Sequence, residues 1–187
     1  MKVIDLTLPG VKRIEPAVFG DERGYFMETY QARRYEGLGA ANGFVQDNLS
    51  FSRRGVLRGL HYQQPNAQGK LVQVLDGEIF DVAVDIRRGS PTFGRWVGEH
   101  LDSKNHHQLW VPPGFAHGFC VLSDTALFAY KCTAFYSPES ERALRWDDPD
   151  IAVVWPIEPS GISEKDRSAP FLKEVPAAHL PAYQVNE

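Results

Sequence analysis

Short stretches of alternating apolar and polar residues, separated by turn signals, occupy most of this 187-residue chain. Outside the central stretch, the pattern predicts strands at 44–52, 94–101, 107–111, 115–122 and 126–136. The only clear helix candidate is short, at 31–39, and ends at Gly37 or Gly39. Many short strands with few helices are typical of an all-β sandwich or barrel.

The central stretch, 70–86, has the strongest pattern. Asp76-Gly77 lies between two alternating runs, a combination that predicts a β-hairpin. In the second run one face carries Phe80, Val82, Val84 and Ile86, and the other carries Asp81, Ala83 and Asp85. Such alternation predicts that one face packs against a core while the other meets solvent or a cavity.

The two ends of the chain have weaker patterns. Residues 1–20 alternate loosely and contain prolines, as an edge strand or an exchanged strand could. Asp21 and Gly24 predict a turn directly after residues 1–20. No linker divides the sequence, so we expect one domain over 1–187, with a core of about 1–172 and a surface tail at 173–187.

Composition narrows the class of protein. The net charge of −4 argues against a general nucleic-acid binder. No run of about 18 apolar residues is present and the first residues lack a signal-type apolar region, so we expect a cytoplasmic protein without membrane spans. Cys120 and Cys132 lie within expected strands and are interpreted as buried, reduced thiols.

The candidate chemistry is concentrated between residues 53 and 73, where Arg58, His61 and Lys70 follow one another closely. A neutral imidazole is a good general base near neutral pH, and a lysine stabilises negative charge that develops on a substrate. These residues suit a reaction of an anionic substrate that passes through an oxyanion. On the residues alone, the favoured interpretations are a structural histidine for His61, a solvated lysine for Lys70 and a core aromatic of its alternating strand for Tyr130.

Seven motifs in order resemble one known family. They are RGLHYQ (58–63), GKLVQVLDGEIFDVAVDIRRGSPTFGRW (69–96), VPPGFAHGF (111–119), YKCT (130–133), YSPESER (136–142), RWDDPD (145–150) and SEKDR (163–167). Together they resemble the dTDP-4-dehydrorhamnose 3,5-epimerases, over roughly residues 1–172. One departure is Ala134-Phe135, where the family often has polar or aromatic residues.

The resemblance implies a cupin-type jelly roll, or double-stranded β-helix, with a few short helices. It also implies a homodimer with strand exchange and an isomerase without cofactor or metal. The expected reaction inverts C3 and C5 of dTDP-4-dehydro-6-deoxy-D-glucose to give dTDP-4-dehydro-L-rhamnose, in the biosynthesis of dTDP-L-rhamnose.

The motifs also imply roles for individual residues. His61 matches the base, Asp166 its carboxylate partner, Lys70 the contact to the C4 oxyanion, and Tyr130 the proton donor on the opposite face. Further matches to substrate-binding positions are Arg23, Glu28, Gln46, Asp47, Asn48, Arg58, His117, Tyr136, Glu141 and Lys165. Among them Arg58 is expected at the phosphates, Tyr136 on the thymine and His117 near the phosphates or the base, while Arg23 and Glu28 are candidates to serve the partner subunit.

Other functions remain open at this point. A single-centre epimerase, inverting C3 or C5 of a related dTDP-sugar, would share every motif, and a cupin that only binds a nucleotide sugar would not need the base, cation and acid together. A metal-dependent cupin is disfavoured, because His61-Tyr62-Gln63 lacks the second histidine of a His-x-His motif and the adjacent His106-His107 would point to opposite faces of a strand.

Overall fold

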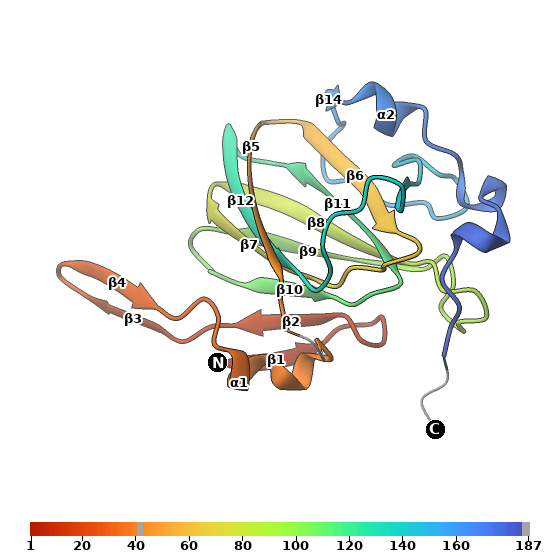
Figure 1. Ribbon diagram of the computed structural model, residues 1–187. Helices are drawn as coiled ribbons and strands as arrows, with labels where there is room; N and C mark the ends of the chain where they lie inside the picture. Colours follow the sequence, from red (N-terminus) through yellow and green to blue (C-terminus); the bar gives the residue numbers. More distant parts are fainter. Residues whose placement is uncertain (41–42, 185–187) are drawn as a thin grey trace.

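Two six-stranded sheets pack face to face in the computed structural model, which describes residues 1–40 and 43–184 (Figure 1). The first sheet has the order β1 (Lys2–Asp5), β2 (Lys12–Glu15), β10 (Gln108–Val111), β7 (Lys70–Asp76), β12 (Thr125–Cys132) and β5 (Gln46–Arg53). The second has the order β13 (Glu141–Ala143), β6 (Val56–Gln63), β11 (Phe115–Val121), β8 (Glu78–Asp85) and β9 (Trp96–Asp102), with β14 (Gly161–Ile162) parallel to β6. The expected all-β jelly roll is confirmed.

The remaining elements are short. A separate hairpin of β3 (Val18–Asp21) and β4 (Gly24–Met27) projects from the body of the molecule (Figure 1). The helical turns are α1 (Ala32–Tyr35), η1 (Glu36–Leu38), α2 (Glu164–Arg167), η2 (Leu172–Glu174) and η3 (Ala177–His179). The expected helix at 31–39 is therefore confirmed as α1 and η1, and it ends at Gly39, whose positive φ of 86° suits glycine.

The main core lies between the sheets. Val72, Val74 and Phe128 of the first sheet pack with Ala83 and Phe119 of the second, and all five are buried. Their alternation along the strands is the reason, since every second side chain of each strand points into this space. Burying a large apolar side chain here contributes roughly 1.5–3 kcal/mol.

The hairpin predicted at Asp76-Gly77 is wrong. β7 pairs with β10 and β12, whereas β8 pairs with β11 and β9, so the chain crosses at Gly77 from one sheet to the other. Gly77 has a φ of 86°, and a Cβ there would lie 2.1 Å from the carbonyl oxygen of Thr125. The turn signal was correct, but the strands on either side pair with other partners.

Both faces of β8 are buried, so the prediction that one of them meets solvent or a cavity holds only in part. Val82 and Val84 pack into a second core cluster on the outer side of their sheet. Asp81 and Asp85 are 0% exposed on the opposite face. Each carboxylate survives burial because it has specific donors, His117 for Asp81 and Arg87 for Asp85.

The C-terminal segment also differs from the expected surface tail. Most of residues 173–184 are exposed, but Leu180 packs into the second core cluster and Ala182 forms a β-bridge with Arg88. At the other end, β1 is the edge of its sheet, as expected, and Cys120 and Cys132 are both buried thiols. Over residues 1–40 and 43–184, no helix is long and apolar enough to cross a membrane.

Candidate active site

A pocket of about 210 Å³ opens between the two sheets. Its lining includes His61 on β6, Lys70 on β7 and Tyr130 on β12. β6 belongs to the second sheet, whereas β7 and β12 belong to the first. The base and acid candidates of the sequence therefore face one another across the pocket.

The local fold of β6 depends on Gly59. Its φ is 132°, and a Cβ at this position would come within 2.5 Å of the Cα of Gly118 on β11. Only glycine allows the two backbones to approach this closely. The close contact fixes β6 beside β11, with the Cα of His61 opposite that of His117.

His61 and Asp166 form a hydrogen-bonded pair, with 2.6 Å between Nε2 and Oδ1. β14 runs parallel to β6 and leads directly into α2, which carries Asp166, so residues 105 positions apart meet. Burial alone would raise the pKa of Asp166, but the hydrogen bond and the charge of His61 outweigh it and lower the pKa. The carboxylate therefore stays ionised and orients the imidazole.

Lys70 is 8% exposed and lines the pocket. Burial lowers the pKa of its ammonium group, and the nearby Cys132 and Asp81 act in the opposite direction. A cation in such a water-poor site stabilises an oxyanion more strongly than it would in water.

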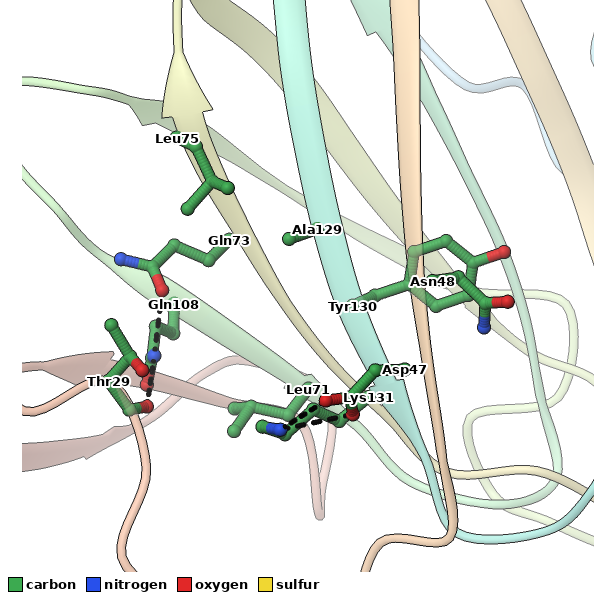
Figure 2. Close-up of a pocket in the computed structure, with 10 residues that line it drawn as sticks. All are labelled: Thr29, Asp47, Asn48, Leu71, Gln73, Leu75, Gln108, Ala129, Tyr130 and Lys131. Carbon is green, nitrogen blue, oxygen red and sulfur yellow. Dashed lines mark hydrogen bonds and ion pairs between the residues drawn. The ribbon is translucent and has the colours of Figure 1, made fainter.

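Tyr130 both packs against the inter-sheet core and lines the pocket. Burial raises the pKa of its phenol, so the group is protonated at neutral pH and is able to act as an acid. Figure 2 shows a second pocket, which Tyr130 and Asn48 also border. Their side chains are directed away from Gln73 and Leu75, which lie on the outer side of the first sheet. The sequence alternation assigned the face of Tyr130 correctly.

The β5 residues divide between the two sides of their sheet. Gln46 and Asn48 line the pocket and are hydrogen-bonded to each other. Asp47 lies on the outer side, where its carboxylate pairs with Lys131 at 2.9 and 3.0 Å (Figure 2). The side chain of Asp47 is thus directed away from the other candidates.

Three candidates meet at the mouth of the pocket. The hydroxyl of Tyr136 donates to Glu141 over 3.0 Å, and Glu141 pairs with Lys165 over 2.5 Å. Burial alone would raise the pKa of Glu141, but these two partners lower it. Lys165 precedes Asp166 on α2, so this helix supports both the base and the rim.

Four residues of the pocket lining were not among the site candidates of the sequence: Tyr62, Gln63, Gln68 and Cys132. Gln63 accepts from the backbone N–H of Ser137 at 3.0 Å, and Gln68 donates to the carbonyl of Ala134 at 2.8 Å. They hold the segment that carries Tyr136.

Besides Asp47, Lys165 and Asp166, four further candidates do not line the pocket. Arg58 is exposed, bonded to Ser52, and its charge acts on Tyr130 from nearby. Arg23, 84% exposed, is in the turn of the projecting hairpin, and Glu28 pairs with Arg34. His117 is buried and bonded to Asp81.

Within residues 1–40 and 43–184, no three histidine, cysteine or acidic side chains converge in a way that could hold a metal ion.

Comparisons with known proteins agree with this geometry. The family model described as dTDP-4-dehydrorhamnose 3,5-epimerase matches residues 5–174. A dTDP-4-dehydrorhamnose 3,5-epimerase of Pseudomonas aeruginosa is 57% identical over 169 residues, which are 89% of this chain and 93% of that protein.

Solved structures are similar over nearly the whole chain. A dTDP-6-deoxy-D-glucose-3,5-epimerase of Legionella pneumophila, in complex with dTDP-4-keto-L-rhamnose, has a TM-score of 0.96 and 55% identity, covering 98% of this chain and 99% of that one. A 3′-monoepimerase of Streptomyces bikiniensis is less similar, with a TM-score of 0.87 and 33% identity over 96% and 93% of the two chains. The chain belongs to the dTDP-4-dehydrorhamnose 3,5-epimerase family.

Proposed function

We propose that the pocket between the sheets inverts C3 and C5 of dTDP-4-dehydro-6-deoxy-D-glucose, with His61 as the base and Tyr130 as the acid. The observation that carries the proposal is that these two side chains come from opposing sheets and line one pocket together with Lys70. A sugar ring bound between them has a base on one face and an acid on the other, which is what inversion of a C–H centre requires.

The ketone at C4 makes the hydrogens on C3 and C5 acidic, and each step is a proton transfer. Because Nε2 of His61 is held by Asp166, Nδ1 is the nitrogen left to take the proton from carbon. The electron pair of the C–H bond moves to the C4 oxygen, where the ammonium of Lys70 stabilises the enolate. Tyr130 then donates its hydroxyl proton to the opposite face of the same carbon. The imidazolium of His61 releases its proton to water and the phenolate of Tyr130 takes one up from water, which restores both groups before the second carbon reacts.

The rest of the pocket fits a nucleotide sugar. Arg58 is well suited to bind the diphosphate, because a guanidinium binds phosphate oxygens in pairs. Tyr136 offers a ring, 52% exposed at the mouth, for the thymine to stack on. Gln46 and Asn48 supply hydrogen-bonding groups on the inner face of β5.

A second copy of the chain is the proposed partner. The projecting hairpin exposes large apolar side chains, with Phe19 at 66% and Phe26 at 71%. The outer face of β5 does the same with Leu49 at 62% and Phe51 at 60%. Such apolar surface is typical of an interface, and exchange of the hairpin would carry Arg23 and Glu28 to the partner's pocket. We place the dimer in the cytoplasm, as expected for an enzyme acting on a nucleotide sugar.

The test is deuterium incorporation from deuterated water, read by proton NMR and mass spectrometry of the product. We expect label at both C3 and C5 with the wild-type protein, and none with His61→Asn. His100→Asn is the matched control, since His100 is an exposed histidine on β9 that pairs with Glu78. Unchanged labelling by His61→Asn would refute the assignment of the base, and label at only one carbon would favour the single-centre reaction of the 3′-monoepimerase.

A further inference from the structure

The space between the two sheets contains an ionisable pair, Asp81 and His117, that has no role in the proposed reaction. Asp81 on β8 is 0% exposed and His117 on β11 is 6% exposed. Nε2 of His117 lies 2.8 and 3.0 Å from the two carboxylate oxygens of Asp81. The imidazole also stacks on Phe128, which in turn contacts Tyr130. Phe128 therefore lies between this pair and Tyr130.

Lys70 faces the same interior from the opposite sheet. Alternation along β7 puts it on the same side as Val72 and Val74, which pack against Ala83 of β8 and the rest of the inter-sheet core. Ala83 and Asp81 share a face of β8 for the same reason. Within residues 1–40 and 43–184, no carboxylate lies within 4.0 Å of the Lys70 ammonium, and this ammonium has no hydrogen-bond partner. A buried ammonium without such a partner tends to become neutral unless a nearby charge opposes this.

The other ionisable groups around the pocket do not supply that charge. Burial raises the pKa of the Cys132 thiol and of the Tyr130 phenol, both on β12, so both are neutral at pH 7. Glu141 of β13 is already paired with Lys165. His61 of β6 is paired with Asp166. In the part of the chain that the structure describes, Asp81 is the remaining carboxylate that acts on Lys70.

We propose that Asp81, held by His117, is a positioning residue that keeps Lys70 positively charged for its contact with the oxyanion. Burial alone acts against both charges, since it raises the pKa of Asp81 and lowers the pKa of Lys70. Each group opposes this change in the other, and the hydrogen bond from His117 also favours the ionised carboxylate. The inference rests on the proposed function of Lys70.

The first measurement is the charge of Lys70 itself, monitored by NMR of protein labelled at the lysine side chains and assigned with Lys70→Arg. We expect Lys70 to be protonated at pH 7 in the wild-type protein and to lose its proton at least one pH unit lower in Asp81→Asn. A neutral Lys70 at pH 7 in the wild-type protein overturns the proposal without any variant having to fold. This readout does not depend on epimerase activity, so it separates this proposal from the failure of the proposed function.

The second measurement is the pH profile of kcat. In Asp81→Asn we expect the fall of kcat at high pH to begin at least one pH unit below that of the wild type, so that the two rates agree at low pH and differ by about tenfold once both are falling. The reason is that the charged fraction of an amine falls about tenfold for each pH increment of one above its pKa. In a Lys70→Arg background, the Asp81→Asn change should add no pH-dependent loss, because a guanidinium keeps its charge. A loss that is equal at every pH, accompanied by a lower melting temperature, would assign Asp81 a structural role only.

Discussion

The pairing of His61 with Asp166 makes a quantitative prediction for Asp166→Asn. The change keeps the shape of a side chain that is 4% exposed and replaces its charge by a neutral amide. The backbone of α2 need not move, because the N-terminal cap of this helix is Ser163, whose hydroxyl accepts from the N–H of residue 166. The variant therefore isolates the effect of the negative charge on the imidazolium that forms during the reaction.

The magnitude follows from the geometry. Two charges about 4 Å apart interact by about 4 kcal/mol at the effective dielectric constant of about 20 that suits protein sites. The His61 side chain is 34% exposed, so water screens part of this, and roughly 2–3 kcal/mol is left. If all of it is lost from the transition state, kcat falls by about 30- to 150-fold.

The assay is the initial rate of product formation under saturating substrate, together with a urea unfolding curve for each protein. Glu164→Gln is the matched control, because it removes an acidic charge from the same helix at an exposed position. We expect the control to keep the wild-type rate. An Asp166→Asn enzyme within a few-fold of wild type would show that the carboxylate does not stabilise the imidazolium, and the reasoning from the 2.6 Å contact would be refuted.

Three further predictions concern the fold and the chemistry. Gly59→Ala should lower the free energy of unfolding by about 4 kcal/mol or more, because the new Cβ would come within 2.5 Å of the Gly118 backbone. Gly89→Ala is the control, since Gly89 also has a positive φ but a Cβ there would have nothing within 4 Å, and it should lower the free energy of unfolding in urea far less. Burial alone would raise the pKa of Asp85, but hydrogen-bond donors including the Arg87 guanidinium outweigh it and lower the pKa. The stability that this carboxylate contributes is therefore complete above pH about 4, near the pKa of the unfolded state, and is lost as the pH falls through the pKa of the folded state. Asp85→Asn should therefore destabilise by about 3 kcal/mol at pH 7 and by less at pH 3, and an equal loss at both would contradict the argument. Prolonged treatment with EDTA should leave the rate of epimerisation unchanged, and loss of activity that is restored by a divalent metal would contradict a metal-free mechanism.

Local patterns in the sequence predicted the side-chain directions well, because the two-residue period of a strand is a local property. Tyr130 and Asn48 were expected on strands, and the structure has both on one inner face. The partner of His61 was beyond this kind of reasoning. Asp166 lies 105 positions away, and only the resemblance to a family suggested that the two residues meet.

Burial of charge is another property that single residues do not reveal. Asp81 and Asp85 occupy positions that hydropathy assigns to a polar face, yet both are 0% exposed. What allows them to be buried is a specific donor in each case, and the donor to Asp81 is His117, 36 positions further along the chain. Hydropathy alone cannot distinguish a carboxylate with such a donor from one that faces solvent.

The crossing between sheets at Asp76-Gly77, which the sequence analysis took for a hairpin, belongs to a pattern that matters for the chemistry. A hairpin and a crossing between sheets can have the same turn residues. Which of the two forms depends on the strands that pair with β7 and β8, and among these β10, β11 and β12 lie further along the chain. From β5 to β8 the chain changes sheet at every turn. This alternation is the reason that His61 and Lys70, which are close in sequence, come from opposing walls of one pocket. A meander of hairpins would put them side by side on a single sheet, where a sugar ring could not lie between the base and the groups that stabilise and reprotonate its enolate.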